Sequence, residues 1–252
     1  MNKKQAHVTL VRAAEGFQHD DELPRGFDWR GFDAYLFDID GTLANFRDQV
    51  HYEAYCNAIQ SIYGHPISLE GLAVNGSTDR LILLEALLRA GIPEKDVRAS
   101  IPGIADFMCT EVERRAAELR PELCPAVPRL LEELKQNGKR LGVASGNLER
   151  IGRAKLKSAG LDEYFEFAAF CGTHETRTQI FQSALEAAHK KLGKKAKVCF
   201  VGDTPADVLA AKGCGAPVIA VATGIFSLVE LGKEGPDMCI PACETLWRYS
   251  RL

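Results

Sequence analysis

Two aspartates form the most reactive pattern in the sequence. Asp38 and Asp40 stand two residues apart, directly after the apolar residues 34–37 and directly before Gly41. Residues i and i+2 of an extended chain face the same way, so both carboxylates are expected to leave a strand end together. Such a pair can bind a hard cation or combine a nucleophile with a proton donor. A plain strand-to-loop turn, in which Asp and Gly are also common, is the competing interpretation.

A second polar segment follows residues 140–144, which are apolar after Arg140. It consists of Ser145, Gly146 and Asn147. The segment offers a hydroxyl, a glycine that permits close backbone approach, and the free N–H groups of a helix start, which attract anions. An ordinary helix cap would use the same residues, so both interpretations stay open from this segment alone.

A third polar segment follows residues 197–201, which are apolar after Lys197. Asp203 precedes a helix that opens with Pro205, a favoured first helical residue, and Asp207 lies one turn further on. If these acids meet the first pair of aspartates, the carboxylates repel one another and one or more of their pKa values rise. Mg²⁺ would remove that conflict, because it prefers oxygen ligands. The pattern therefore predicts a magnesium site.

The bulk composition excludes several classes of protein. The chain has 252 residues, 46% of them hydrophobic, and a formal net charge of −3, so it can bury a large core and carries no basic footprint for nucleic acid or anionic membranes. Eight cysteines are scattered without a C-x-x-C pair, which is typical of reduced thiols in a cytoplasmic protein. We expect a soluble protein, because no signal peptide or run of about 20 apolar residues is visible.

The elements that must position the polar segments indicate an α/β fold with a doubly wound parallel sheet. Strand-like runs alternate with helical patterns along the second half of the chain. The expected strands are 34–37, 140–144, 165–171, 197–201, 218–221 and 238–240, and the expected helices are 148–158, 178–192 and 205–212. In such a sheet ligands bind at the carboxyl ends of the strands, where the three polar segments would meet.

Residues 46–131 have a different character. They are rich in helix formers and lack convincing strands, with helices expected at 51–63, 78–90, 95–99 and 104–119, and a further helix at 128–136. The block is too long for an ordinary crossover, so we expect an inserted helical cap domain, with 1–45 and 132–252 forming the core domain. Residues 6–13 suggest a short strand or arm, and 16–31 an irregular leader.

From residue 35 to the C-terminus, the chain resembles the haloacid dehalogenase-like superfamily of aspartate-nucleophile hydrolases. Residues 38–42 (Asp-Ile-Asp-Gly-Thr) match the first motif, Ser145 the second, and Asp203 with Asp207 the acidic fourth. The helical insert after the first motif is similar to a type 1 cap. Residues 148–165 and 220–224 further resemble phosphoglycolate-phosphatase-type members.

The resemblance implies a Rossmann-like core, hydrolysis of a phosphomonoester and a role for each motif residue. Asp38 would be the nucleophile and Asp40 the general acid and base; the dehalogenases of the superfamily lack an acid at the second position, so Asp40 favours phosphoryl transfer. The metal would be Mg²⁺. Its implied ligands are Asp38, the backbone carbonyl of Asp40 and Asp203, with Asp207 behind them, and the implied phosphate-binding residues are Ser145, Gly146, Asn147 and Arg177.

The third motif departs from the family pattern. Such members usually carry a lysine ahead of the helix that leads to the fourth motif, whereas here Arg177 is the nearest cation. Arginine is planar and more extended than lysine, so the exchange is not neutral. Lys155 is the other nearby cation, but it falls in the middle of a helix, where we expect it to face solvent. His174 is expected to be an ordinary loop residue.

The substrate is expected to be a small phosphorylated metabolite, for example phosphoglycolate, a sugar phosphate or a nucleotide. Residues 75–79 form a polar turn ahead of a cap helix and are candidates for facing the leaving group, although Ser77 or Thr78 could simply cap that helix. Two alternatives stay open. One is a phosphomutase of the β-phosphoglucomutase type, and the other is a non-catalytic phosphate-binding protein, suggested by the missing lysine. The sequence allows a monomer or a homodimer.

Overall fold

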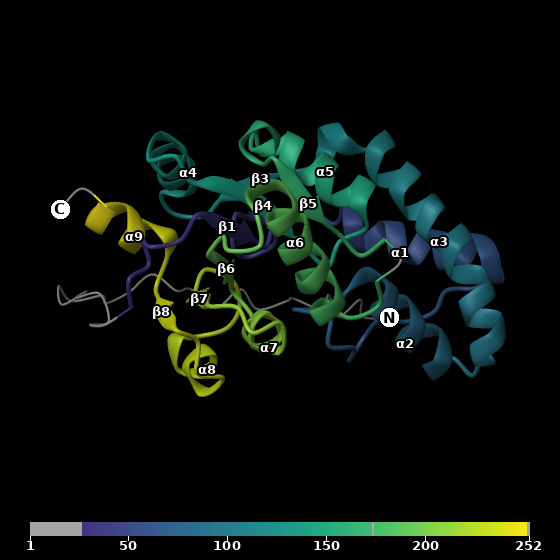
Figure 1. The fold of residues 1–252 in the computed structure, drawn as a ribbon. Coiled ribbons are helices and arrows are strands. Elements are labelled where there is room, and N and C mark those ends of the chain that lie inside the picture. The colour runs from purple at the N-terminus through teal and green to yellow at the C-terminus, as the bar shows by residue number, and fades with distance from the viewer. Residues whose placement is uncertain (1–26, 173, 251–252) are drawn as a thin grey trace.

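The computed structural model describes residues 27–172 and 174–250, which are built around a six-stranded parallel sheet (Figure 1). The strand order is β5-β4-β1-β6-β7-β8. The strands are β1 (Ala34–Phe37), β4 (Arg140–Ala144), β5 (Phe167–Ala169), β6 (Val198–Gly202), β7 (Val218–Val221) and β8 (Met238–Ile240). From β1 the chain adds strands first on one side and then on the other, so the predicted doubly wound α/β fold is confirmed.

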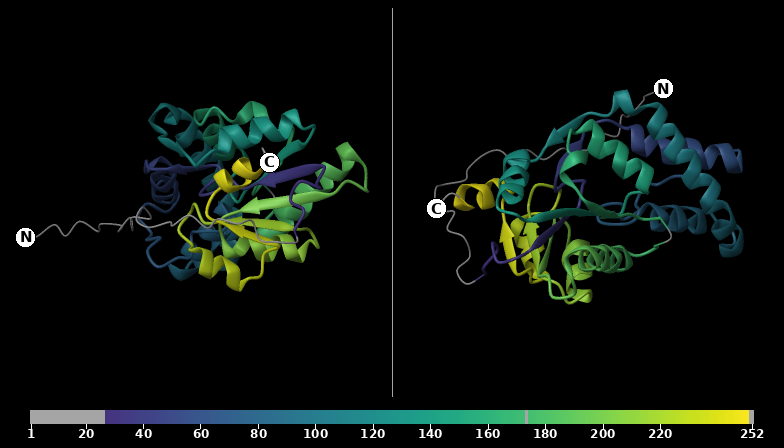
Figure 2. Two further views of the ribbon diagram at one scale, coloured as in Figure 1. Left: turned by 90° about the vertical axis from the view of Figure 1, so that its left-hand side faces the viewer. Right: turned by 45° about the horizontal axis from the view of Figure 1, so that its top comes forward.

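Helices cover both faces of this sheet (Figure 2). On one face lie α4 (Val127–Gln136), α5 (Glu149–Ser158) and α9 (Cys243–Ser250), and on the other α6 (Arg177–Leu192), α7 (Pro205–Gly213) and α8 (Leu228–Lys233). Successive strand residues point to opposite faces, so Tyr35 and Phe37 join one apolar cluster and Leu36 joins the other. Burial on both faces explains why the strands read as continuous apolar runs.

A helical block lies at one end of the sheet, on the right in Figure 1. It contains α1 (Val50–Tyr63), α2 (Asp79–Arg89) and α3 (Glu94–Arg114), which share an apolar cluster of their own. The prediction of two helices at 95–99 and 104–119 was wrong, because α3 continues through Pro102. Its buried residues, Ile101 and Ile104 among them, keep one face against the cluster, and this packing outweighs the backbone hydrogen bond that proline removes.

A two-stranded antiparallel ribbon connects the block to the sheet. It pairs β2 (Ala44–Phe46) with β3 (Pro121–Leu123), so the expectation that residues 46–131 lack strands was wrong. Strands of three residues are too short to produce a periodic signal in the sequence. The leucines of α4 pack in the sheet's cluster, on both sides of the expected boundary at residue 131; the division into domains stays a prediction.

Three expectations concern the termini, membranes and cysteines. The strand or arm at 6–13 and most of the leader at 16–31 lie outside the described residues. Within the described ranges, none of the helices has both the length and the apolar character needed to cross a membrane. All eight cysteines are free thiols.

Candidate active site

Three carboxylates meet where β1 and β6 end. The two strands are paired neighbours, and the N–H of Asp38 donates to the carbonyl of Val201 at 3.0 Å. Oxygens of Asp38, Asp203 and Asp207 all lie within 4.8 Å of one another, and the three side chains are buried. The structure therefore brings together Asp38, Asp203 and Asp207, three of the acidic residues that the sequence singled out at the strand ends.

Arg177 is the cation of this cluster. It is the first residue of α6, is only 8% exposed, and lies with Nη2 2.6 Å from Asp38 Oδ2 and with Nε donating to Asp207 Oδ1 at 2.5 Å. Thr176 is the N-cap of α6. This cap fixes the start of the helix and thereby the position of Arg177. One guanidinium thus contacts two of the three carboxylates, and the cluster has a formal net charge of −2 when all three acids are ionised.

Burial, together with the neighbouring charges, alters the acidity of the cluster. Burial raises the pKa of Asp38 to about 6, with Asp207 adding to the rise and Arg177 opposing it. Burial, followed by the charge of Asp207, also raises the pKa of Asp203 well above its usual range. Asp38 Oδ1 has no hydrogen-bond partner among the described residues. Buried anions in this state require a compensating cation, and carboxylate oxygens suit Mg²⁺, so the donor set fits such an ion.

Close backbone approach shapes the surroundings of Asp203. Thr42 Oγ1 donates to Asp203 Oδ1 at 2.9 Å, which orients the carboxylate. A Cβ added to Gly224 would lie 1.8 Å from Asp203 Oδ2, and one added to Gly41, whose φ is +83°, would lie 2.2 Å from the same oxygen. Glycine is required at both positions, because any side chain there would displace the carboxylate.

Asp207 has both carboxylate oxygens engaged by the protein. Oδ2 accepts from the N–H of Thr204 at 3.0 Å and from its hydroxyl at 2.7 Å in a capping box at the start of α7. Oδ1 accepts from Arg177. These contacts leave Asp207 less free to bind an ion than Asp38, whose Oδ1 has no hydrogen-bond partner among the described residues.

The side chain of Asp40 lies in a separate environment. Lys155 Nζ is 2.7 Å from Asp40 Oδ1 and 2.9 Å from Oδ2, and Asn147 Nδ2 donates to Oδ2 at 2.7 Å. Lys155 also donates to Asn147 Oδ1 at 2.9 Å. Enclosure in the site raises the pKa of Asp40, but Lys155 and the hydrogen bond from Asn147 outweigh it, so the net shift is downward. Asp40 is thus an ion-paired carboxylate.

The expectation that Lys155 faces solvent was wrong, because it is only 3% exposed. The face of α5 that carries Ile151 and Leu156 is buried, and Lys155 lies on that face with its ammonium 5.1 Å from the centre of the Phe46 ring. The i, i+4 spacing from Ile151 to Lys155 was the signal that could have revealed this placement. Its neighbour Lys157, by contrast, is exposed.

The polar segment after β4, residues 145–147, contacts Asp40 through Asn147. Ser145 is buried, and its Oγ accepts from Asn147 Nδ2 at 2.8 Å. Asn147 was expected to bind phosphate through its N–H group, and its side chain is engaged with Asp40 and Lys155. Gly146 has no room for a side chain, because an added Cβ would lie 2.5 Å from the carbonyl oxygen of Ser77. The turn at 75–79 therefore rests directly on this loop.

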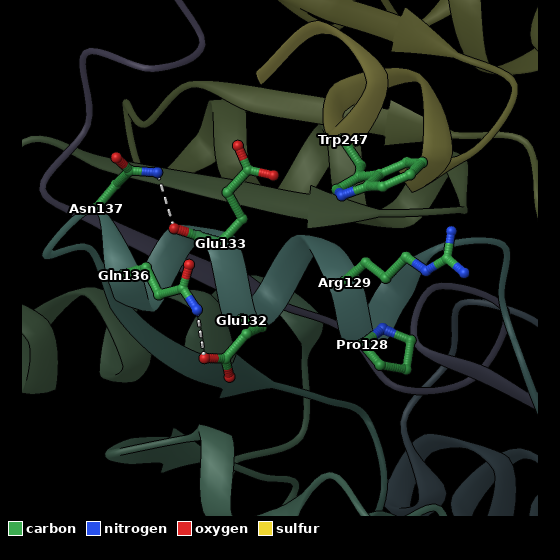
Figure 3. Close-up of a pocket in the computed structure, with 7 residues that line it drawn as sticks. All are labelled: Pro128, Arg129, Glu132, Glu133, Gln136, Asn137 and Trp247. Carbon is green, nitrogen blue, oxygen red and sulfur yellow. Dashed lines mark hydrogen bonds between the residues drawn. The ribbon is translucent and has the colours of Figure 1, made fainter. Parts of the chain in front are cut away.

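Two other features are not part of the carboxylate cluster formed by Asp38, Asp203 and Asp207. His174 lies in the loop between β5 and α6, as expected. A surface hollow between α4 and α9 contains the Arg129 guanidinium, 5.0 Å from the centre of the Trp247 ring (Figure 3). None of the site residues is among those that line this hollow, which are Pro128, Arg129, Glu132, Glu133, Gln136, Asn137 and Trp247.

The chain is similar to a known family and to known phosphatases. The family model of haloacid dehalogenase-like hydrolases matches residues 32–215. The sequence is 28% identical to a phosphoglycolate phosphatase of Agrobacterium fabrum over 217 residues, 81% of this chain and 86% of that protein. It is 27% identical to phosphoglycolate phosphatase 1 of Pseudomonas aeruginosa over 212 residues, 81% of this chain and 75% of that protein.

A solved structure shows the same fold. The crystal structure of CbbY from Rhodobacter sphaeroides in complex with phosphate superposes with a TM-score of 0.58 at 21% identity. The match covers 83% of this chain and 93% of that one. At this level of identity the likeness concerns the arrangement of strands and helices.

Proposed function

Because this chain belongs to the haloacid dehalogenase-like hydrolases, we propose that it is a Mg²⁺-dependent phosphatase of a small phosphomonoester. The observation that carries the proposal is the opposite setting of two carboxylates at one strand end. Asp38 lies in a buried acidic cluster with one oxygen free, and Asp40 lies beside a lysine. A nucleophile needs a free oxygen, and a proton-transfer group needs a defined partner.

In the first step Asp38 Oδ1 attacks phosphorus, and the bond from phosphorus to the leaving oxygen breaks as Asp40, which must enter this step in its protonated form, donates its proton to that oxygen. In the second step Asp40 takes a proton from water, which attacks phosphorus and releases phosphate and free Asp38. Lys155 and Asn147 hold the Asp40 carboxylate in both steps. The lowered pKa of Asp40 favours its role as the base in the second step.

Mg²⁺ would be held by Asp38, the backbone carbonyl of Asp40 and Asp203, with Asp207 in support. When bound, it supplies the positive charge that lets an anionic phosphate approach an anionic nucleophile. The two unbalanced negative charges of the cluster support a divalent rather than a monovalent ion.

The phosphoryl oxygens would bind to Ser145 and to the N–H groups of Gly146 and Asn147, with Arg177 contributing charge beside Asp38. The contact of 2.6 Å between Arg177 and Asp38 supplies the cation whose absence motivated the non-catalytic alternative. The names of the two curated relatives support phosphoglycolate or another small phosphorylated metabolite as the substrate.

The test is release of inorganic phosphate from p-nitrophenyl phosphate and from a panel of phosphorylated metabolites, with Mg²⁺ and with EDTA. We expect Mg²⁺-dependent release and one preferred metabolite. Absence of release at every Mg²⁺ concentration, from a folded protein, would contradict the proposal. Isomerisation of a sugar phosphate by a bisphosphate-activated enzyme, with little phosphate release, would instead indicate a phosphomutase.

A further inference from the structure

Asp79, the first residue of α2, is a buried carboxylate outside the reacting cluster. It is 4% exposed, and its partners come from two parts of the fold. Tyr55 of α1 donates its hydroxyl to Asp79 Oδ1 at 2.5 Å, and His51 Nε2 lies 3.4 Å from Oδ2. The third partner is the N–H of Leu148, which donates to Oδ2 at 2.6 Å. The first two partners belong to the helical block, whereas Leu148 belongs to the loop that carries Ser145.

The backbone on either side of Asp79 makes further contacts with the site loops. The N–H of Asp79 donates to the carbonyl of Gly146 at 2.9 Å, so Asp79 holds the loop with both its backbone and its side chain. Thr78 caps α2 and also donates its hydroxyl to the carbonyl of Glu175 at 2.6 Å. A Cβ added to Gly76 would lie 2.8 Å from Thr204 Oγ1. Residues 76–79 therefore touch three loops of the candidate site.

Asp79 is held there as an anion. Burial raises its pKa, but His51, Tyr55 and the N–H of Leu148 outweigh burial, so the net shift is downward. The ring of His51 stacks on Tyr55 with the centres 5.1 Å apart. Removing one of the three partners of a buried carboxylate costs much more free energy than removing a partner of an exposed one. The contact between α2 and the loop at 145–148 is therefore a specific one.

We propose that Asp79 is a positioning residue that fastens the helical block onto the phosphate-binding loop. Its bonds to Leu148 and Gly146 fix the segment that begins at Ser145, and the same bonds hold the block over the site. Substrate exchange then requires this contact to open, and the reaction requires it to re-form. This inference rests on the proposed function for its kinetic consequence, but the contact itself can be tested without turnover.

The experiment compares Asp79→Ala, Asp79→Asn and Tyr55→Phe by amide hydrogen exchange of the metal-free and the Mg²⁺-loaded protein. In Asp79→Ala we expect faster exchange in peptides covering 145–149 and 75–80 together, with the strands of the sheet unchanged. Asp79→Asn keeps an acceptor oxygen and should restore most of the protection. Tyr55→Phe removes a bond to the same carboxylate from within the block only, and should leave residues 145–149 protected.

The kinetic part uses the preferred phosphorylated metabolite and p-nitrophenyl phosphate. We expect Asp79→Ala to lower kcat/KM for the metabolite by about 10- to 100-fold, with part of the loss in KM, and Asp79→Asn to recover most of it. Unchanged exchange at 145–149 in Asp79→Ala would overturn the inference, as would kcat/KM within about twofold of the parent. If the parent protein hydrolyses none of the substrates, the proposed function fails. The hydrogen-exchange result still shows whether Asp79 holds the loop at 145–149.

Discussion

Asp38 and Asp40 are separated by one residue, yet they lie in opposite electrostatic environments. Asp38 shares a buried space with two other carboxylates and one arginine, whereas Asp40 faces its own lysine and an asparagine. The pKa of Asp38 is raised and that of Asp40 is lowered. Two carboxylates whose environments separate their pKa values are suited to separate chemical roles.

The two environments also differ in their charge balance, which bears on where the proposed metal would bind. The cluster around Asp38 combines three carboxylates with one guanidinium, so its formal net charge is −2 when all three acids are ionised. The Asp40 half pairs one carboxylate with one ammonium and is balanced by the protein alone. The proposed divalent cation would therefore be needed beside Asp38 only, which would leave Asp40 free for its proposed role in proton transfer.

The largest expected effect comes from Asp38→Asn. An amide cannot act as the nucleophile, so we expect the rate of phosphate release to fall by more than about 10⁴-fold. Burst-phase and steady-state phosphate assays measure this, with circular dichroism to confirm folding. Activity close to that of the parent would falsify the assignment of Asp38.

Asp40→Asn should give a smaller loss with a different signature. The variant keeps the nucleophile but lacks the proton-transfer group, so we expect a fall of about 10²- to 10⁴-fold and accumulation of phosphoenzyme. Incubation with labelled substrate followed by acid quench and mass analysis of residues 34–43 detects the acyl phosphate. If the label appears equally in Asp38→Asn, Asp38 is not the attacking group.

Lys155→Met tests whether the Asp40 half depends on its own cation. Loss of the ammonium leaves Asp40 enclosed without its partner, so its pKa should rise and the acidic limb of the pH–rate profile should move to higher pH. We expect kcat to fall by about 10- to 100-fold. Lys157→Met, on the exposed side of the same helix, is the matched control and should leave both quantities unchanged.

The sequence predicted the sheet well because strand signals and strand ends are local properties. Residues 140–144, 218–221 and 238–240 are strands with the expected bounds, since apolar runs flanked by polar turns specify buried parallel strands. The meeting of Asp38 and Asp203 followed from topology, because the carboxyl ends of neighbouring parallel strands lie at one edge.

What the sequence did not predict depends on how helices are rotated and on contacts between distant residues. Lys155 was expected in solvent, because lysine usually is exposed and only the tertiary partner Asp40 makes its burial favourable. Tyr52 and Ile62 have helical spacing with Tyr55 and Ile59, yet they are exposed, because α1 buries the face that carries Ala54 and Ala58. The role of Asp79 likewise appears only once α2 is placed against Leu148.

The smallest expected effect is on the stability of the folded protein. It distinguishes the cluster around Asp38 from the surroundings of Asp40 and needs no substrate. Asp38 and Asp203 have raised pKa values in the folded protein, so the native state binds their protons more tightly than the unfolded state does. The stability they contribute is present below about pH 4 and is lost as the pH rises through about 6 and beyond. Asp40 has a lowered pKa, so its contribution has the opposite sign and is lost only on acidification.

We therefore expect the free energy of unfolding of the metal-free protein to fall by about 1–3 kcal/mol between pH 5 and pH 8, measured by urea denaturation in EDTA. Asp203→Asn should reduce this slope, because it removes one of the repelling charges, and Asp162→Asn, at an exposed position, should not. Mg²⁺ should reverse the slope, since it binds only the deprotonated cluster and stabilises the folded state. If the free energy of unfolding in EDTA does not change between pH 5 and pH 8, Arg177 alone balances the carboxylate cluster. Asp38 and Asp40 would then differ in the geometry of their surroundings rather than in charge.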